Sequence, residues 1–184
     1  IFAIDVARSQ SQSNNKSCIV VLKIIRNNKG AIRQIQLVNM VEPPNGYTFK
    51  EQSVVVKRLF YKYGGNLDLT KSRVKAIVID GNVIGKGLID RLCEECTDPD
   101  TNEELGCFAS MNSDIHCDNP EAPLLIYDLT AQGINGDIIT KFMDYVETER
   151  LKLLKNYEEI KSKIPSNEIV EGKQACLNTK FLID

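Results

Sequence analysis

Hydrophobic and polar residues alternate with a period of two in several short stretches of this chain, and this pattern predicts a β-sheet. Between residues 32 and 40, for example, Ile35 and Leu37 alternate with glutamines. Alternation of this kind, and short apolar runs bounded by turn residues, are typical of strands. The Asn27–Gly30 link predicts a hairpin turn, because Asn and Gly tolerate positive φ. The expected strands are Phe2–Val6, Ser17–Ile25, Ile32–Met40, Val74–Ile79 and Leu124–Leu129.

Helix signals lie between these strands. Thr48 and Glu51 have the spacing of a capping box, and the helix that they open is expected to end at Gly64-Gly65. A short helix is expected around Leu88–Leu92, and a longer one from about residue 137 to about residue 154 with apolar residues along one face. The alternation of strands and helices predicts a single α/β domain over residues 1–184.

Length and composition suit a compact domain. The chain has 184 residues, of which 42% are hydrophobic, and no apolar run approaches the roughly 18 to 20 residues of a membrane span. We therefore expect a soluble protein without contact to a membrane. Because a strand-like run already includes Ile1 and no initiator Met precedes it, the chain is expected to be a fragment of a longer protein.

Charge is strongly segregated along the chain. Residues 1–91 have a net charge of +9, whereas residues 92–140 contain no Lys or Arg and have a net charge of −11. This asymmetry favours a polyanion-facing part beside an acidic insertion, at about residues 93–123, that forms a mobile flap or docks a partner. Ordinary solvated faces are the simpler alternative.

Four of the six cysteines form the pattern C-x2-C-x10-C-x9-C. They are Cys93, Cys96, Cys107 and Cys117, with His116 beside the last. A structural Zn²⁺ site would use one close pair and more distant partners, but this sequence lacks a second close pair. Reduced thiols in a surface loop are therefore the preferred interpretation, and zinc is the alternative.

Catalytic chemistry based on histidine is disfavoured, because His116 is the single histidine and lies in the expected insertion. The glycines Gly81, Gly85 and Gly87 follow a strand, but they lack the register of a Walker phosphate loop. We expect them to let a phosphodiester backbone approach Asp80 closely.

Two aspartates are the strongest candidates for chemistry. Asp5 and Asp80 each stand where an apolar, strand-like run ends. A carboxylate at the end of a buried strand costs several kcal/mol unless a cation compensates it, and two such strands can bring their acids onto the same ions. We therefore predict a site for two Mg²⁺ or Mn²⁺ ions, in which Asp5 bridges both ions and Asp80 binds one. The alternatives are a turn cap at Asp5 and an Asp-Gly turn at Asp80.

Basic residues close in sequence to these acids are candidate DNA contacts. Arg8 follows Asp5 by three residues and Lys86 follows Asp80 by six. Both are candidates to bind a phosphate, with exposed loop charges as the alternative. Further candidates to extend this track, for which ordinary surface charge is the preferred alternative, are Lys16, Lys57, Arg58 and Lys62.

Taken together, these motifs resemble the nuclease domain of tailed-phage terminase large subunits, a family with a ribonuclease H-like fold. The resemblance covers nearly the whole chain. It is carried by the segments 2–9, 14–21, 77–90, 97–104, 123–127 and 133–139, which match the family's first strands, second acidic strand, variable insertion, last core strand and following helix.

The resemblance implies a mixed central sheet, with three antiparallel strands followed by parallel strands, flanked by helices. It also implies a metal-dependent endonuclease that cuts double-stranded viral DNA during genome packaging in the cytoplasm of an infected bacterium. An ATPase motor domain would precede it in the same chain, and portal and small terminase proteins would be its partners. A non-catalytic docking module of the packaging motor and a junction resolvase or transposase-like nuclease of the same fold are alternatives.

The family's third acid lies near the end of the domain, where this chain offers no convincing match. Asp184, Glu171 and Glu168 are the fallback candidates for the third metal ligand. The ligand is otherwise expected to lie beyond residue 184.

Overall fold

The computed structural model describes residues 1–7, 16–81, 83–113, 115–117, 119–129 and 136–153. Seven strands form one mixed sheet in the hydrogen-bonded order β7-β8-β4-β1-β2-β3-β9. The α/β class and the mixed sheet predicted from the sequence are thus confirmed. The chain divides into two compact units, residues 1–19 with 42–134 and residues 20–41 with 135–184.

Parallel strands form the core of the first unit. β1 (Phe2–Asp5) pairs with β4 (Ile77–Ile79), and β4 pairs in turn with β8 (Leu124–Asp128). The two-residue β7 (Ala109–Ser110) lies parallel to β8. Strand β4 begins three residues later than predicted, and the predicted ends of β1 and β8 differ from the observed ends by one residue.

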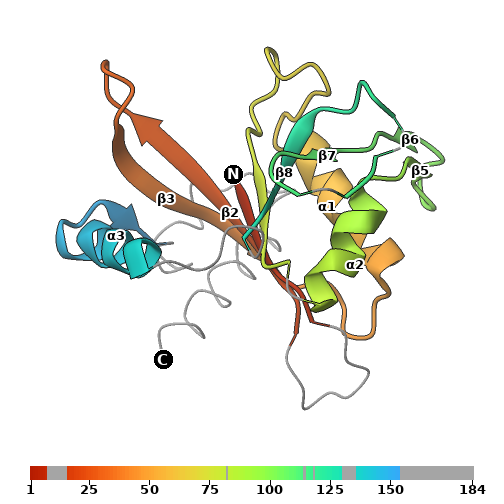
Figure 1. The fold of residues 1–184 in the computed structure, drawn as a ribbon, viewed down its shortest axis with the longest axis horizontal. Coiled ribbons are helices and arrows are strands. Elements are labelled where there is room, and N and C mark those ends of the chain that lie inside the picture. Colours follow the sequence, from red (N-terminus) through yellow and green to blue (C-terminus); the bar gives the residue numbers. More distant parts are fainter. Residues whose placement is uncertain (8–15, 82, 114, 118, 130–135, 154–184) are drawn as a thin grey trace, which may run out of the picture. The chain divides into compact units, whose positions relative to one another are not determined.

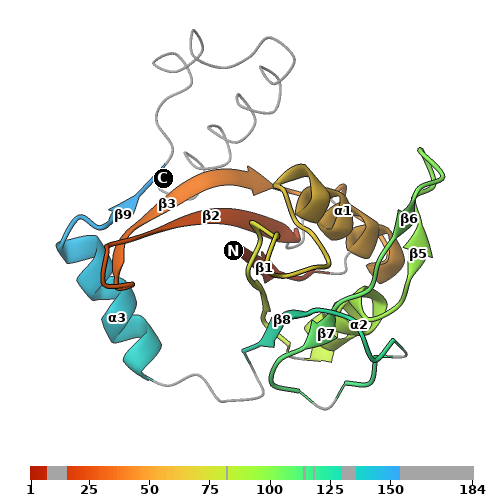
Figure 2. The same ribbon diagram turned by 90° about the horizontal axis from the view of Figure 1, so that it is seen from above.

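Helices α1 (Phe49–Lys62) and α2 (Val83–Leu92) lie side by side, as Figures 1 and 2 show. They cover one face of the parallel strands. The ring of Phe2 packs edge-on against Tyr63 at the end of α1, with ring centroids 5.9 Å apart. The side chain of Ile79 lies next to Gly85 in α2. The capping box predicted for α1 is present, with Thr48 Oγ1 accepting from Glu51 N and Glu51 Oε2 accepting from Thr48 N.

The second unit contains a β-hairpin and a helix. β2 (Cys18–Arg26), which starts in the first unit, is joined to β3 (Ile32–Val41) by the predicted turn, in which Asn27 N donates to Ala31 O at 2.8 Å. Helix α3 (Gly136–Glu147) leads into β9 (Leu151–Lys152), which runs parallel to β3, as Figure 2 shows.

The end of α3 corrects the prediction of a helix reaching about residue 154. Glu149 has a φ of +54°, which stops the helical path. Arg150 then turns back, and its guanidinium contacts Asp144 and lies 4.5 Å from the ring centroid of Tyr145. The sequence pattern missed this end because Leu153 continues the apolar face of the helix, whereas in the structure Leu151 already pairs with Ile35 of β3.

The acidic segment 93–123 is packed within the first unit, so the expectation that it forms a mobile flap is wrong. Its short hairpin consists of β5 (Cys96–Thr97) and β6 (Glu104–Leu105). Phe108 is fully buried, and its ring lies 4.7 Å from that of Phe60 in α1. The segment therefore contributes to the core of the unit.

No helix in the part of the chain that the structure describes is long and apolar enough to cross a membrane.

Candidate functional site

Asp5 and Asp80 lie at the carboxyl ends of two neighbouring parallel strands. Ile4 of β1 is in register with Ile79 of β4. Asp5 is the last residue of β1, and Asp80 directly follows β4. The ladder continues to this level, because Asp80 N donates to Ile4 O at 3.3 Å. Since hydrogen-bonded strands lie about 4.8 Å apart, the two acids are direct neighbours at this edge.

Both acids face away from helices α1 and α2. Side chains alternate between the two faces of a strand, and Ile4 and Ile79 are buried against the helix-covered face. Asp5 is accordingly exposed and Asp80 is half-buried. The structure therefore places the two predicted site residues on one face and at one edge, which is the arrangement that a shared cation requires.

A third aspartate, Asp128, lies at the end of the next strand but on the opposite face. It is in register with Ile79, on the helix-covered side, and only 2% of its surface is exposed. Its backbone is held on both sides by Asn112, whose side chain accepts from Asp128 N at 2.9 Å and donates to Asp128 O at 2.8 Å. The sequence analysis missed Asp128 because it extended the strand to Leu129, although an acid at a strand end is the signal that identified Asp5 and Asp80.

The carboxylate of Asp128 packs beneath the turn that follows Asp80. A Cβ added to Gly81 would lie 2.0 Å from Asp128 Oδ1, and one added to Gly85 would lie 1.9 Å from the carbonyl oxygen of Asp80. These glycines therefore allow close internal packing of the turn and the first turn of α2. The expectation that they admit a phosphodiester backbone is not supported, because protein atoms fill the space beside them.

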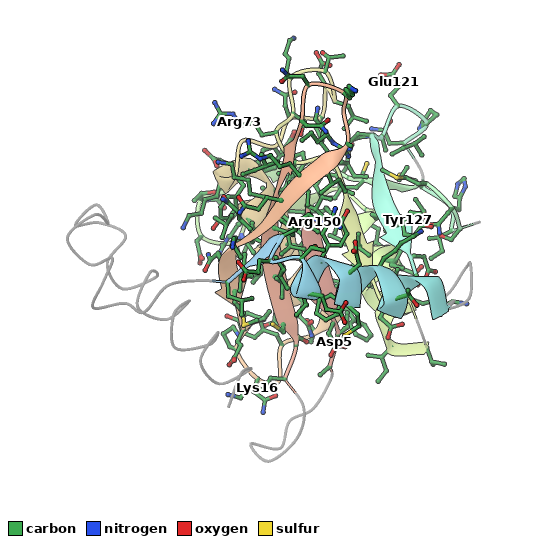
Figure 3. The ribbon with its side chains drawn as sticks, turned by 90° about the vertical axis from the view of Figure 1, so that its left-hand side faces the viewer. Asp5, Lys16, Arg73, Glu121, Tyr127 and Arg150 are labelled. Atoms are coloured by element: carbon green, nitrogen blue, oxygen red, sulfur yellow. The ribbon has the colours of Figure 1, made fainter. Side chains whose placement is uncertain are left out.

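The start of β2 and the residue after β3 reach the same edge as Asp5. Burial, followed by the charges of Glu42 and Asp5, raises the pKa of the Cys18 thiol to about 11. Glu42 also forms an ion pair of 3.4 Å with Lys16. Figure 3 shows Asp5 and Lys16 toward one end of the structure, and Arg73 and Glu121 toward the other. A neutral thiol, one further acid and one base thus lie near Asp5 at the end of β1.

The exit from β1 is fixed by a buried polar network. Ser17 Oγ accepts from Ala7 N and donates to Gln52 Oε1, each at 2.9 Å. Gln52 Nε2 donates to Ala7 O at 3.2 Å and to Tyr47 O at 3.0 Å. These bonds anchor the backbone two residues after Asp5 to α1, so Asp5 stands on a rigid support.

Of the basic residues predicted to bind DNA, Lys16 and Lys86 are exposed and described, whereas Arg8 lies outside the described residues. The side chain of Lys16 is 54% exposed, and an ion pair at such a surface is worth about 0–1 kcal/mol. The pair with Glu42 therefore holds Lys16 only weakly, and a phosphate could replace Glu42 as its partner. Lys86 projects from the first half of α2, the helix that directly follows Asp80.

For two other candidates, the prediction of a DNA contact is wrong. Lys57 is fully buried, and its ammonium donates to the carbonyl of Glu94. Arg58 binds Asp98 through two hydrogen bonds and also pairs with Asp100 at 2.6 Å. Both side chains thus hold the acidic segment 93–123 against α1. The sequence shows that both residues are basic, but it does not show that their partners come from the same chain.

Asp5 and Asp80 supply carboxylate oxygens of the kind that Mg²⁺ and Mn²⁺ prefer. Among the described residues, no group of three or more His, Cys, Asp or Glu side chains is arranged to hold a metal ion. The candidates for the third ligand, Asp184, Glu171 and Glu168, lie outside these residues. Mg²⁺ needs only one or two protein carboxylates when substrate phosphate and water complete its shell, so the pair fits such an ion.

Three of the four cysteines of the acidic segment come together. Cys117 Sγ donates to the carbonyl of Cys93 at 3.3 Å, and hydrogen bonding with Cys117 contributes to the raised pKa of Cys107. Cys96 points elsewhere, with its sulfur 3.6 Å from Lys57 Nζ. The structure therefore separates Cys96 from the other members of the pattern seen in the sequence.

Comparisons of the chain with family models, curated proteins and solved structures give no match.

Proposed function

We propose that this chain is a metal-dependent endonuclease domain that cuts double-stranded DNA by two-metal-ion hydrolysis, with the ribonuclease H-like fold of the terminase nucleases that its motifs resemble. One observation carries the proposal. Asp5 and Asp80, which are 75 positions apart in the sequence, follow the registered pair Ile4 and Ile79 and share the face opposite helices α1 and α2.

The role of each residue follows from its position. The carboxylate of Asp5 is exposed, forms no hydrogen bond or ion pair with other described residues, and would bridge the two ions. Asp80 would bind one of them. Bound Mg²⁺ or Mn²⁺ supplies activation of the attacking water and stabilisation of the leaving 3′ oxygen. Lys16 and Lys86 would hold neighbouring phosphates of the duplex, which fixes the DNA without reading its sequence.

The rigid surroundings of the two acids support this proposal. The Ser17–Gln52 network holds the chain after Asp5, and the packing of Gly81 on Asp128 holds the chain after Asp80. A site built on rigid elements keeps its ligands in place before substrate binds, which is what metal-assisted catalysis needs.

The test is cleavage of supercoiled plasmid and linear duplex by the full chain in Mg²⁺ or Mn²⁺, compared with Asp5→Asn and Asp80→Asn. We expect each substitution to lower the rate by at least about 100-fold, because changes outside the ligand sphere alone cost about 10–100-fold. Asp90→Asn is the matched control. Asp90 is exposed on α2, the helix that follows Asp80, and lies about 10 Å beyond the start of that helix. This variant should therefore cut at the original rate.

Other outcomes separate the alternatives. Binding of duplex DNA without metal-dependent cleavage, together with Mn²⁺ affinity unchanged by Asp5→Asn, would contradict the nuclease proposal and favour a docking module. Strong preference for branched over linear DNA would favour a junction resolvase. Thermal unfolding of every variant is measured alongside, so that loss of cleavage is not confused with loss of fold.

A further inference from the structure

The β2–β3 hairpin is basic along the half that carries its turn. Residues 20–41, the part of the chain that forms most of this hairpin in the second unit, contain four Lys or Arg and no Asp or Glu. The four cations are Lys23, Arg26, Lys29 and Arg33. At a rise of about 3.4 Å per residue, all of them lie within about 14 Å of the turn, which joins the two strands in Figure 1.

The two halves of the hairpin differ in burial. Toward the base of the hairpin, the side chains of Val21, Leu37 and Met40 are buried. Toward the turn, all four cations are exposed. The apolar base therefore holds the hairpin in the fold, whereas the half near the turn presents positive charge to solvent.

Hydrogen bonds fix the turn between the two strands. Asn27 Oδ1 accepts from Lys29 N at 2.9 Å and from Ala31 N at 3.0 Å. Gly30 has a φ of +80°, which glycine adopts without strain, and its carbonyl accepts from Arg26 Nη1 at 2.7 Å. An ordered turn holds its charges in place before a partner arrives, which lowers the entropic cost of binding.

Two of the cations share one face of the ribbon. Asn27 N donates to Ala31 O at 2.8 Å, so these two residues are opposite each other at the turn. Lys23 is four residues before Asn27, and Arg33 is two residues after Ala31. Because side chains alternate between the faces of a strand, Lys23 and Arg33 lie on the same face, where such diagonal neighbours are about 7–8 Å apart.

None of the four cations forms an ion pair with a carboxylate among the described residues. In the same unit, Arg150 pairs with Asp144, and Lys152 pairs with Glu149. Like charges that are close together on a sheet repel each other, so their concentration near the turn does not stabilise the fold. A polyanion bound at this half of the hairpin would remove the repulsion.

We propose that the turn half of the β2–β3 hairpin is an additional DNA-binding surface, in which Lys23, Arg26, Lys29 and Arg33 contact backbone phosphates of a duplex. The choice of DNA as the polyanion rests on the proposed nuclease function. A two-stranded ribbon fits the major groove of B-DNA, which is about 12 Å wide, and cations on such a ribbon reach the phosphates that border the groove. Phosphate contacts position the duplex without reading its sequence.

The test is the affinity of the full chain for a fluorescent DNA duplex, measured by anisotropy over a series of salt concentrations in EDTA. EDTA prevents metal-dependent cleavage, so the measurement does not depend on Asp5 and Asp80. Substitution of all four hairpin cations by Gln should weaken binding and reduce the slope of log affinity against log salt by about 3–4 in magnitude, because each lost phosphate contact removes about 0.9.

A matched control changes four exposed cations of the first unit to Gln, so that the net charge changes equally. The control positions are Lys71, Arg73, Lys75 and Arg91. This control should keep the original salt slope, and an equal loss in both variants would overturn the proposal by showing that only net charge matters. Thermal unfolding is measured for both variants.

A single substitution keeps the test informative if the fourfold hairpin variant fails to fold. Lys29→Gln leaves the backbone bonds of the turn in place and should lower the salt slope by about 1. An unchanged slope in a folded Lys29→Gln protein would remove Lys29 from the DNA-binding surface and overturn the proposal as stated.

Two comparisons separate this proposal from others. A reduced slope in a protein that never cleaves DNA would support the hairpin surface and contradict the nuclease proposal, whereas an unchanged slope beside cleavage that depends on Asp5 would contradict the hairpin surface alone. Vesicles that contain anionic lipid are the other polyanion tested. If the hairpin variant loses vesicle binding but keeps its DNA affinity, the surface binds membranes and the proposal is overturned.

Discussion

The carboxyl edge of β1 and β4 and the acidic segment 93–123 both gather carboxylates, but they differ in how these acids are partnered. In the segment, Asp98 is almost fully buried and receives two hydrogen bonds from the guanidinium of Arg58. At the edge, the carboxylate of Asp5 is exposed and makes neither a hydrogen bond nor an ion pair with other described residues. Asp98 thus serves the fold, whereas the carboxylate of Asp5 remains available to a ligand.

The difference also explains the charge segregation along the chain. Basic side chains of α1 turn toward the acidic segment, so part of the positive charge in residues 1–91 neutralises part of the negative charge in residues 92–140. Charge blocks that suggest an external polyanion can therefore be matched internally. Lys16 and Lys86, which lie near the two acids and are exposed, are the better candidates for DNA contact.

The largest effect expected in this comparison is that of Phe108→Ala. If the acidic segment belongs to the core, removal of a fully buried ring should lower the free energy of unfolding by about 3–5 kcal/mol, measured by urea denaturation. Leu124→Ala, at a residue that is 54% exposed, is the control and should change it by no more than about 0.5 kcal/mol. An equally small effect of Phe108→Ala would restore the interpretation of this segment as a flap.

Gly85→Ala should have the next largest effect. Its Cβ would lie 1.9 Å from the carbonyl oxygen of Asp80, so the first turn of α2 must move. Overpacking of this kind costs about 3 kcal/mol, and the displacement of Asp80 should also abolish metal-dependent cleavage. In the control Gly106→Ala, the Cβ meets the flexible end of Leu67, which can move aside. Equal melting temperatures for the two variants would show that the turn after Asp80 is not tightly packed.

Asp98→Asn and Asp5→Asn should have opposite consequences for stability. The hydrogen bonds from Arg58 hold the pKa of Asp98 well below its usual range. The ionised form of Asp98 therefore stabilises the fold above the usual pKa of about 4, and this stabilisation is lost as the pH falls through the lowered value. Asp98→Asn should destabilise the protein at pH 7 and progressively less in acid.

Asp5→Asn, in contrast, should leave the melting temperature unchanged or raise it, because no partner among the described residues is lost. It should also make the Cys18 thiol more reactive toward an alkylating reagent, since the charge of Asp5 contributes to the raised pKa of Cys18. A clear loss of stability in Asp5→Asn would indicate that this acid is structural.

The smallest effect is expected for Lys16→Ala. The surface ion pair with Glu42 contributes little to stability, so the melting temperature should stay the same. DNA affinity should decrease for all sequences alike, and the slope of log affinity against log salt should fall in magnitude by about 1. Lys71→Ala is a matched control, because Lys71 also forms a surface ion pair but comes before the start of β4, whereas Asp80 follows the end of that strand. An unchanged salt slope in Lys16→Ala would remove Lys16 from the DNA track.

Local signals in the sequence predicted most of the elements. The capping box of Thr48 and Glu51 and the turn after Asn27 depend on residues a few positions apart, and both are present. The prediction that Asp5 and Asp80 end two strands also rested on local pattern. The end of α3 was missed because the pairing of Leu151 with β3, rather than the helical period, decides it.

The sequence by itself determined which residues are apolar, roughly where the longer strands and helices lie, and that Asp5 and Asp80 stand at strand ends, because these properties depend on neighbours within one turn or one strand. Only the tertiary structure decided that Asp5 and Asp80 share a face while Asp128 takes the opposite one, since this follows from the register of separate strands. It also decided that Lys57 and Arg58 bind their own chain, because burial and ion pairing join residues about 40 positions apart.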